Sequence, residues 1–165
     1  MRSTRAARWR RRSPRRKSLT PTRTSYVGGQ VEHGPMFLFD LAERLGIPVH
    51  WRRTMDDVGT WYPDHGCIAI REGQTWAEVR SVLAHELGHA ILRHEDDSPK
   101  NEAAADRWAA NALLTAEAVA ACARHYPHNP EKWCAELDVT PDILRAWLRD
   151  PENYGAAEER LDLAS

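Results

Sequence analysis

The pentapeptide His85-Glu86-Leu87-Gly88-His89 constrains this chain more than any other stretch. A helix turns by about 100° per residue, so the second histidine lies only about 40° from the first and the two rings point the same way. Glu86 falls about 60° from His89 on the helical wheel, so its carboxylate reaches the space beside an ion held by the histidines without ligating it. The spacing therefore predicts a hydrolytic metal site; the plain alternative is a helix with two surface or core histidines.

A third metal ligand must come from elsewhere, because a catalytic Zn²⁺ usually takes three protein ligands and leaves one position for water. Ser98 can cap a second helix and Pro99 suits its first position, which places Glu102 in its first turns. We expect Glu102 to be the third ligand. Asp106 lies four residues further on, on the same face, and can accept the second ring N–H of a ligand histidine, which fixes the tautomer of that ring.

These motifs carry a resemblance to a known family. HELGHAILRH, followed by EAAADRWAANALL, closely resembles the ImmA/IrrE family of small metallo-endopeptidases, which are similar to the gluzincins. The resemblance runs over about Met36 to Leu148, and its most specific segment is Val82 to Leu114. It implies a zincin-like fold and a zinc-dependent endopeptidase that cuts a specific protein, such as a transcriptional repressor, in bacterial stress responses or mobile elements.

The resemblance also implies roles for single residues. His85, His89 and Glu102 match the family's zinc ligands, and Glu86 matches its catalytic base. The chain departs from the family at Ala104, where many members have a second acidic residue. Glu102 is thus the carboxylate at a ligand-like position, apart from Asp106.

A second hypothesis treats the same site as structural. In it the chain is a non-catalytic regulatory module that contacts DNA or a partner through its arginine-rich N-terminal tail or its C-terminal helices. A structural zinc site has no need of Glu86 and tends to be closed by a fourth protein ligand. The full set of His85, Glu86, His89 and Glu102 therefore favours catalysis.

The charge of the chain is unevenly distributed. Residues 1–25 hold 10 of the 23 basic residues and none of the 24 acidic ones, so the formal net charge of -1 averages two unlike parts. Residues 1–29 lack apolar periodicity, and we expect a disordered basic tail. Residues 2–23 can make weak contacts with nucleic acid or with an acidic partner, although a merely solvated tail fits as well. No stretch resembles a secretory signal or is apolar enough to cross a membrane, so we expect a cytoplasmic protein.

We expect one α+β domain, with a small antiparallel or mixed sheet packed on the HExxH helix and on the helix that carries Glu102. Residues 30–115 form its zincin-like core, residues 116–150 a helical C-terminal part of the same domain, and residues 151–165 a tail. The length suffices for one modest hydrophobic core. The cysteines Cys67, Cys122 and Cys134 are odd in number and lack CxxC spacing, which indicates neither a disulfide framework nor a cysteine zinc site.

The elements before the metal motif follow from periodicity and turn signals. We expect a helix over Met36–Leu45, a strand over Val49–Arg53, and a hairpin of Val58–Tyr62 with Cys67–Arg71. Thr75 and Glu78 form a capping box that begins the HExxH helix. In zincin-like folds an exposed strand beside the metal cleft can bind substrate along its edge, and Cys67–Arg71 is the candidate here; an ordinary core strand is the equal alternative.

Three further helices are expected after the metal motif. One opens after Thr115, one runs from Pro130 to Leu137, and one runs from Pro141 to about Arg149. The last two resemble a helix-turn-helix, but the second of them carries Asp142 and Asp150 with only Arg145 and Arg149, a poor match to phosphate. We therefore favour structural packing over DNA binding.

A second stabiliser of the reaction's oxyanion is needed in most such sites, and the sequence leaves it open. The candidates are His94, His125, Tyr126 and Tyr62.

Overall fold

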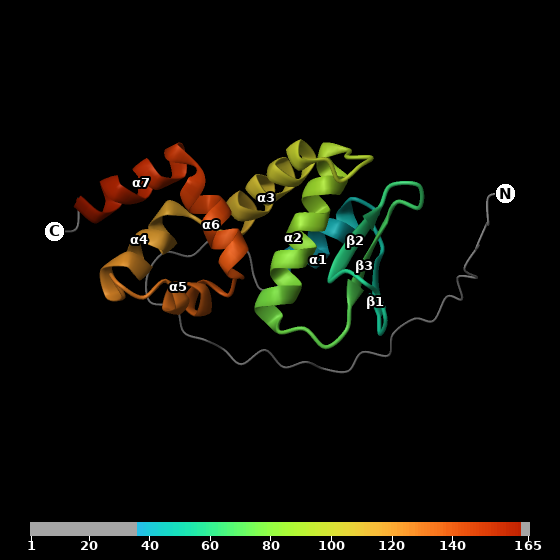
Figure 1. Cartoon of the computed structure of the whole chain (residues 1–165), viewed down its shortest axis with the longest axis horizontal. Coiled ribbons are helices and arrows are strands. Elements are labelled where there is room, and N and C mark those ends of the chain that lie inside the picture. Colours follow the sequence, from blue (N-terminus) through green and yellow to red (C-terminus); the bar gives the residue numbers. More distant parts are fainter. Residues whose placement is uncertain (1–35, 163–165) are drawn as a thin grey trace.

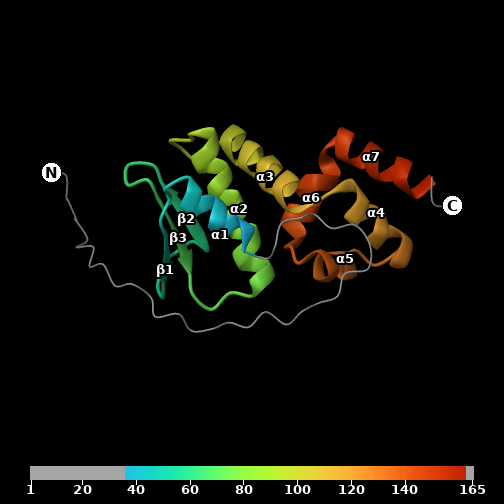
Figure 2. The ribbon, with the colours of Figure 1, turned by 180° about the vertical axis from the view of Figure 1, so that it is seen from behind.

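A three-stranded sheet and seven helices make up residues 36–162, the part of the chain that this computed structural model describes. In order they are α1 (Phe37–Arg44), β1 (Val49–Arg52), β2 (Gly59–Tyr62), β3 (Cys67–Arg71), α2 (Trp76–Leu92), α3 (Pro99–Leu113), α4 (Ala116–His125), α5 (Pro130–Leu137), α6 (Pro141–Arg149) and α7 (Pro151–Asp162). Figures 1 and 2 show the sheet at one end of the molecule and α4 to α7 at the other, with α2 and α3 between them. The expected α+β class is confirmed.

The sheet is mixed, with the strand order β1-β3-β2. β1 pairs with β3 in parallel, with Val49 opposite Ile68, and β2 pairs with β3 antiparallel, which confirms the predicted hairpin. Of the two alternatives for Cys67–Arg71, the exposed edge is wrong and the ordinary core strand is confirmed. Because β1 and β2 occupy both of its sides, β3 is the central strand, and its first four residues are buried. Within residues 36–162, the edge strand beside the metal motif is β2.

Helix α2 lies against this sheet and carries the HExxH motif. Its start is fixed as predicted: Glu78 N donates to Thr75 Oγ1 at 3.3 Å, and Thr75 N donates to Glu78 Oε2 at 2.7 Å. Leu83 and Leu87 point into the core and are fully buried. The helix ends where Arg93 adopts a left-handed conformation, with φ of 58°. The chain therefore turns back sharply after the motif.

Helices α2 and α3 pack closely, and two small residues make this possible. A Cβ atom at Gly88 would lie 3.0 Å from the Ala105 carbonyl oxygen, tighter than ordinary van der Waals contact. Ala105 is itself fully buried. Pro99 occupies the first turn of α3 as expected; Ser98 is the N-cap residue, but its side chain makes no capping hydrogen bond. This close approach carries the first turns of α3 past the histidine face of α2.

The C-terminal helices begin where the sequence predicts. Thr115 Oγ1 accepts from Ala118 N at 3.3 Å at the start of α4, and Asn129 Oδ1 accepts from Lys132 N at 3.2 Å at the start of α5. Helix α6 buries its apolar face, Ile143, Leu144 and Trp147, against the core. This placement agrees with a packing role for the predicted helix-turn-helix.

The expectation of a tail over residues 151–165 is wrong for the described part, because Pro151–Asp162 forms helix α7. Asp150 begins it: its side chain accepts from Glu152 N at 3.1 Å, and its carbonyl accepts from Tyr154 N at 3.0 Å. The helix packs on α4 and α6 and buries Ala157. Asp150 and Pro151 thus follow the end of one helix and begin the next.

Helix α6 is tied to α2 through the chain that leads into it. Thr140 N donates to Ser81 Oγ at 3.0 Å, and Arg80 Nη1 donates to the carbonyl of Asp138 at 3.2 Å. These contacts hold α6 beside the sheet-facing helix that bears the histidines. The C-terminal helices thereby complete one side of the site described below.

Two predictions fall on residues that the structure does not describe: the basic tail of residues 1–29 and the contacts of residues 2–23 with nucleic acid or an acidic partner. All three cysteines are free thiols. Among residues 36–162, no helix has both the length and the apolar character needed to cross a membrane.

Candidate metal centre

The two motif histidines and Glu102 converge on one point. His85 Nε2 and His89 Nε2 lie 3.0 Å apart. Glu102 Oε2 lies 3.4 Å from His85 Nε2, and Glu102 Oε1 lies 3.2 Å from His89 Nε2. The helical repeat aligns the rings on α2, and the packing of α3 on α2 brings the carboxylate to them.

The donor atoms fit a zinc ion. Zinc binds histidine nitrogen and carboxylate oxygen at about 2.0 to 2.2 Å, so the ligand atoms of a tetrahedral site lie about 3.3 Å apart. The three separations given above fall around this value. Among the residues that the structure describes, His85, His89 and Glu102 form the group that can hold a metal ion, with ligand atoms all within 4.8 Å of one another. Two nitrogens and one carboxylate are also a donor set that suits zinc.

The other ring nitrogen of His85 has a partner. His85 Nδ1 lies 2.9 Å from Asp106 Oδ1, on the helix that supplies Glu102. With Nδ1–H donating to the carboxylate, Nε2 is left with a free lone pair that faces the other ligand atoms. The structure thus places Asp106 where the sequence predicts it.

The other ring nitrogen of His89 also has a partner, which sequence reasoning missed. His94 Nδ1 lies 3.1 Å from His89 Nδ1, and the two rings meet edge to face. The left-handed residue Arg93 folds the chain back so that His94 N also donates to the His89 carbonyl at 3.0 Å. A histidine just past the end of a HExxH helix is the signal that could have indicated this contact.

Glu86 is held by the edge of the sheet. The backbone N–H of Trp61 in β2 donates to Glu86 Oε2 at 2.6 Å, a contact that the sequence did not indicate. β2 comes this close because residue 59 is glycine: a Cβ atom there would collide with the Val82 side chain and lie 3.3 Å from Glu86 Oε1. A glycine in a strand that faces a helix is a weak sign of such an approach.

Burial changes how Glu86 titrates. Removal from water raises the pKa of Glu86 to about 7, although the charge of His85 and the hydrogen bond from Trp61 act in the opposite direction. A carboxyl group with a pKa near neutral can both take up and return a proton at neutral pH. Glu86 therefore suits general acid and base chemistry.

The two histidines titrate differently. Burial is the largest influence on the pKa of His85 and lowers it, but the hydrogen bond to Asp106 and the nearby carboxylates outweigh it, so this pKa is raised. Burial and the positive charge of His85 lower the pKa of His89. His89 thus favours the neutral form that binds a metal.

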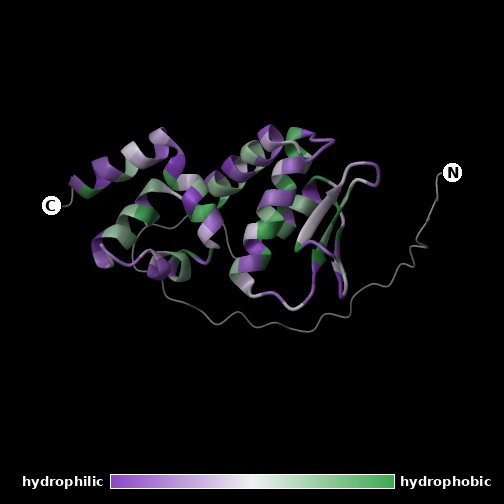
Figure 3. Ribbon diagram, viewed as in Figure 1, coloured by the Kyte–Doolittle hydropathy of each residue, from purple (hydrophilic) through white to green (hydrophobic). Residues whose placement is uncertain are grey.

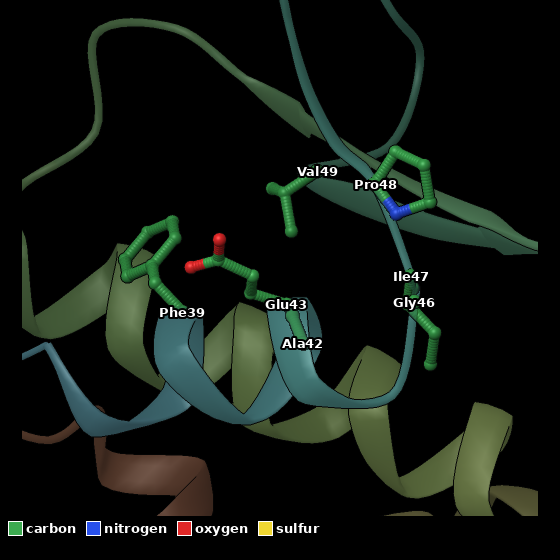
Figure 4. Close-up of a pocket in the computed structure, with 7 residues that line it drawn as sticks. All are labelled: Phe39, Ala42, Glu43, Gly46, Ile47, Pro48 and Val49. Atoms are coloured by element: carbon green, nitrogen blue, oxygen red, sulfur yellow. The ribbon is translucent and has the colours of Figure 1, made fainter.

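The site opens into a cleft of about 870 Å³. Its walls come from β2 and the loop before it, from the histidine face of α2 and the loop after it, and from α6. A smaller hollow of about 390 Å³ lies between α1 and the start of β1 (Figure 4). Glu43 is the one charged residue that lines this hollow, and no histidine lines it. The candidate site is therefore the larger cleft together with His85, His89 and Glu102, which we call the metal group.

Of the four candidates for oxyanion stabilisation, His94 lines this cleft. His125 Nδ1 donates to the Ala121 carbonyl on its own helix, and the Tyr126 hydroxyl donates to Glu136 at 3.3 Å. Tyr62 follows the cleft-lining residue Trp61 in β2 but is not itself among the residues that line the cleft. The structure thus leaves His94 as the member of the four beside the metal group.

Comparison with known families gives one match. The family model Peptidase_M78, described as the IrrE N-terminal-like domain, matches residues 42–148, more than half of the chain. This confirms the resemblance drawn from the two motifs. Searches of the curated proteins and of the solved structures find no significant match.

Proposed function

Because the chain belongs to the peptidase family of the IrrE N-terminal-like domain, we propose that it is a zinc-dependent endopeptidase with a zincin-like core. One observation carries this proposal: a carboxylate from α3 lies 3.4 and 3.2 Å from the two Nε2 atoms of the HExxH helix. Glu86 lies beside them. It is buried, and it is not one of the three residues that could hold the ion.

His85, His89 and Glu102 would hold the ion. When bound, zinc supplies a positive charge that polarises a carbonyl group and makes a water molecule more acidic. Asp106 fixes the ring of His85, and His94 fixes the ring of His89, so both Nε2 atoms stay directed at the same point.

Glu86 moves the protons of the reaction. Its carboxylate accepts a proton from the attacking water, and the carboxylic acid returns it to the amine that leaves. In the metal-free chain burial raises its pKa to about 7, and the charge of a bound ion would lower this pKa and favour the carboxylate that takes up the proton. The Trp61 N–H fixes Oε2, which leaves Oε1 as the oxygen that exchanges the proton. Overall, water adds across one peptide bond, giving a carboxylate and an amine.

The free edge of β2 is the place that we propose for an extended substrate. Val58 O accepts from Arg71 N in β3 at 3.0 Å. Backbone groups alternate along a strand, so those of Gly59 and Trp61 point away from β3. The bond from Trp61 N–H to Glu86 agrees with this direction and occupies that N–H, so an added peptide would pair with the remaining backbone groups of this edge. A peptide added to this edge would lie along the cleft, next to the metal group.

The proposed substrate is one specific protein, a transcriptional repressor or similar regulator. Support comes from the resemblance of the two motifs to a family whose members cut such proteins. An extended cleft lined by backbone edges favours a flexible segment over a folded surface, because strand addition needs free backbone groups.

The experiment uses the full chain loaded with zinc. It is incubated with unfolded casein and with any repressor encoded beside its gene, and new chain ends are identified by mass spectrometry. We expect cleavage that a chelator abolishes and that zinc restores. Glu86→Gln should retain zinc, measured as bound metal per chain, yet cut at least about a thousandfold more slowly. Full activity of Glu86→Gln would remove Glu86 from the mechanism.

The competing hypothesis of a structural zinc module predicts a different result. It expects association with duplex DNA that falls steeply with salt and that survives Glu86→Gln. Helix α6 gives it little support, since its apolar face is buried and Arg145 pairs with Asp142 at 2.7 Å. The open cleft at the metal group favours the enzyme.

A further inference from the structure

Two adjacent residues of α2 join that helix to the chain that leads into α6. Ser81 Oγ accepts from Thr140 N at 3.0 Å. Arg80 Nη1 donates to the carbonyl oxygens of Asp138 at 3.2 Å and of Leu137 at 3.4 Å. Ser81 is 4% exposed and the Arg80 side chain is 16% exposed, so water competes little for these bonds. We call the contacts of Arg80 and Ser81 with this part of the chain the clamp.

The clamp acts where one helix ends and the next begins. The last carbonyl groups of a helix lack partners within it and carry a partial negative charge, so a guanidinium suits the end of α5. Asp138 ends that helix in a left-handed conformation, with φ of 53°. Two residues later, Thr140 is the N-cap residue of α6. The clamp therefore fixes the start of α6 against α2.

Helix α6 is one of two walls of the cleft. Figure 1 shows the sheet on one side of α2 and α6 on the other. Gly59 and Trp61 line the cleft from β2, and Arg145 and Arg149 line it from α6, with the metal group among the lining residues. Figure 3 shows both hydrophilic and hydrophobic residues along α6, because its other face packs on the core. The clamp thus sets where the second wall stands.

The clamp is close to the metal group but separate from it. Four residues separate Ser81 from His85, so their side chains lie only about 40° apart around α2. Ser81 and Thr140 both line the cleft. Neither Arg80 nor Ser81 contacts a metal ligand through the bonds of the clamp. A change in the clamp can therefore move α6 while leaving the ligand atoms in place.

The edge of β2 needs such a second wall to bind a peptide. The strand is short, running from Gly59 to Tyr62, and the N–H of Trp61 on its outer edge is taken by Glu86. Few backbone groups are then left for an added peptide, whose ordering on binding costs free energy. Contact with α6 across the cleft would supply the surface that the edge lacks.

We propose that Arg80 and Ser81 are positioning residues for the substrate. They hold α6 as the second wall, so that an extended peptide is bound between α6 and the edge of β2. The inference rests on the proposed peptidase function and deepens it by assigning part of the substrate binding to the C-terminal helices. Loss of the clamp should weaken peptide binding and leave the reacting groups unchanged.

The first test measures initial rates on unfolded casein with the full chain loaded with zinc. In Ser81→Ala and in Arg80→Met, KM should rise at least about fivefold while kcat stays within about twofold, because binding is lost equally in the ground and transition states. Arg80→Lys keeps a charged donor and should recover part of the loss. Bound zinc and the visible spectrum of the cobalt-substituted chain should match wild type. An unchanged KM, or a fall in kcat or in bound zinc with KM unchanged, would overturn the inference.

A matched control removes a hydrogen bond between helices elsewhere. Asn153 Nδ2 of α7 donates to Asn111 Oδ1 of α3 at 2.8 Å, and neither residue lines the cleft. Asn111→Ala should keep the wild-type KM; a rise equal to that of Ser81→Ala would mean that any loosening of these helices has the same effect, against a specific clamp. Hydrogen exchange of the Thr140 amide should be faster in Ser81→Ala than in wild type, and an unchanged rate would contradict the clamp itself.

A binding measurement separates the two proposals. Fluorescent unfolded casein is titrated with zinc-loaded Glu86→Gln, and its anisotropy is followed. Weaker binding by the double variant Glu86→Gln, Ser81→Ala supports the positioning role even if wild type cuts nothing, a result that would defeat the peptidase proposal alone. Equal binding by the two variants defeats the positioning role alone. Absence of binding by both would contradict the substrate cleft, and with it both proposals.

Discussion

Gly88 of α2 lies directly against Ala105 of α3, so closely that a Cβ atom on Gly88 would lie 3.0 Å from the Ala105 carbonyl oxygen and 3.1 Å from its Cα atom. The neighbours are backbone atoms, which cannot turn aside as a flexible side chain would. Helix α3 can lie this close only because residue 88 has no side chain. The distance of Glu102 from the two histidines therefore depends on this glycine.

Gly88→Ala should weaken metal binding more than it weakens the fold. Overpacking costs about 1 to 3 kcal/mol, but alanine regains about 1 kcal/mol of helix propensity. We expect zinc affinity, measured by competition with a chromophoric chelator, to fall at least about tenfold as α3 is pushed outward. The control is Gly155→Ala in α7, where nothing lies within 4 Å of the added atom. It should raise the unfolding free energy by about 0.5 to 1 kcal/mol and keep zinc affinity; equal affinities in the two variants would contradict the packing argument.

Glu86→Gln should change how the stability of the metal-free chain depends on pH. The pKa of Glu86 rises from an ordinary 4.5 to about 7 on folding. Between these values the folded chain binds more protons than the unfolded chain, so this group makes the fold less stable as pH rises from 4.5 to 7. Below about pH 4.5 the effect is absent.

The test of Glu86 is a thermal unfolding series with chelator present. Wild type and Glu86→Gln should have similar Tm values near pH 4.5, while at pH 8 the variant should be more stable by about 1 to 3 kcal/mol, or at least about 3 °C. Glu117→Gln, a change at an exposed acid on α4, serves as the control. A pH-independent difference between wild type and Glu86→Gln would show that burial does not raise this pKa.

A graded pair of changes at Asp106 should separate charge from hydrogen bonding. Asp106→Asn retains an oxygen that can accept from His85 Nδ1–H, so its zinc affinity should fall only about threefold. Asp106→Ala has no acceptor, so its zinc affinity should fall by about 10 to 100-fold. Isothermal titration against a competing chelator gives both values. Asp40→Ala, at an exposed position of α1, should match wild type. An alanine variant with wild-type affinity would mean that the contact at 2.9 Å does not orient the ring.

His94 should act through His89, and a conservative change should restore its effect. His94→Ala removes the acceptor for His89 Nδ1–H, so zinc affinity should fall about tenfold. His94→Gln supplies an amide oxygen and should recover part of the loss. The visible spectrum of the cobalt-substituted chain reports the ligand geometry in each case. His128→Ala, in the loop before α5, is the matched control; a glutamine variant as weak as the alanine variant would contradict the positioning role.

Local signals in the sequence were enough for most elements. Capping residues and prolines mark where α2, α4, α5 and α6 begin, because N-caps and first-turn prolines act within one turn of chain. Sequence reasoning failed where one signal has two uses. Asp150 and Pro151 end α6 and begin α7, and the helix is stabilised by its packing on α4 and α6, which no local pattern displays.

In the sheet, too, local sequence signals predict one pairing of strands, and contacts between distant segments decide the other. Alternating residues predict the hairpin of β2 and β3, since its two strands are joined by a short turn. The parallel pairing of β1 with β3 joins residues that are far apart in sequence, and this pairing makes β3 central and leaves the edge to β2. The side chains of β3 gave no sign of it, because a buried strand can be central or lie at an edge under a helix.

By itself the sequence determined the direction of the two imidazoles, because a four-residue step on a helix aligns them whatever surrounds the helix. It also placed Glu102 and Asp106 on one face of the following helix. Only the tertiary structure decided that this face meets the rings, that a strand edge holds Glu86 through Trp61, and that His94 turns back to His89. Those contacts depend on how α2 packs against α3 and β2 and on a left-handed turn at Arg93, and packing between distant segments is set by the whole core.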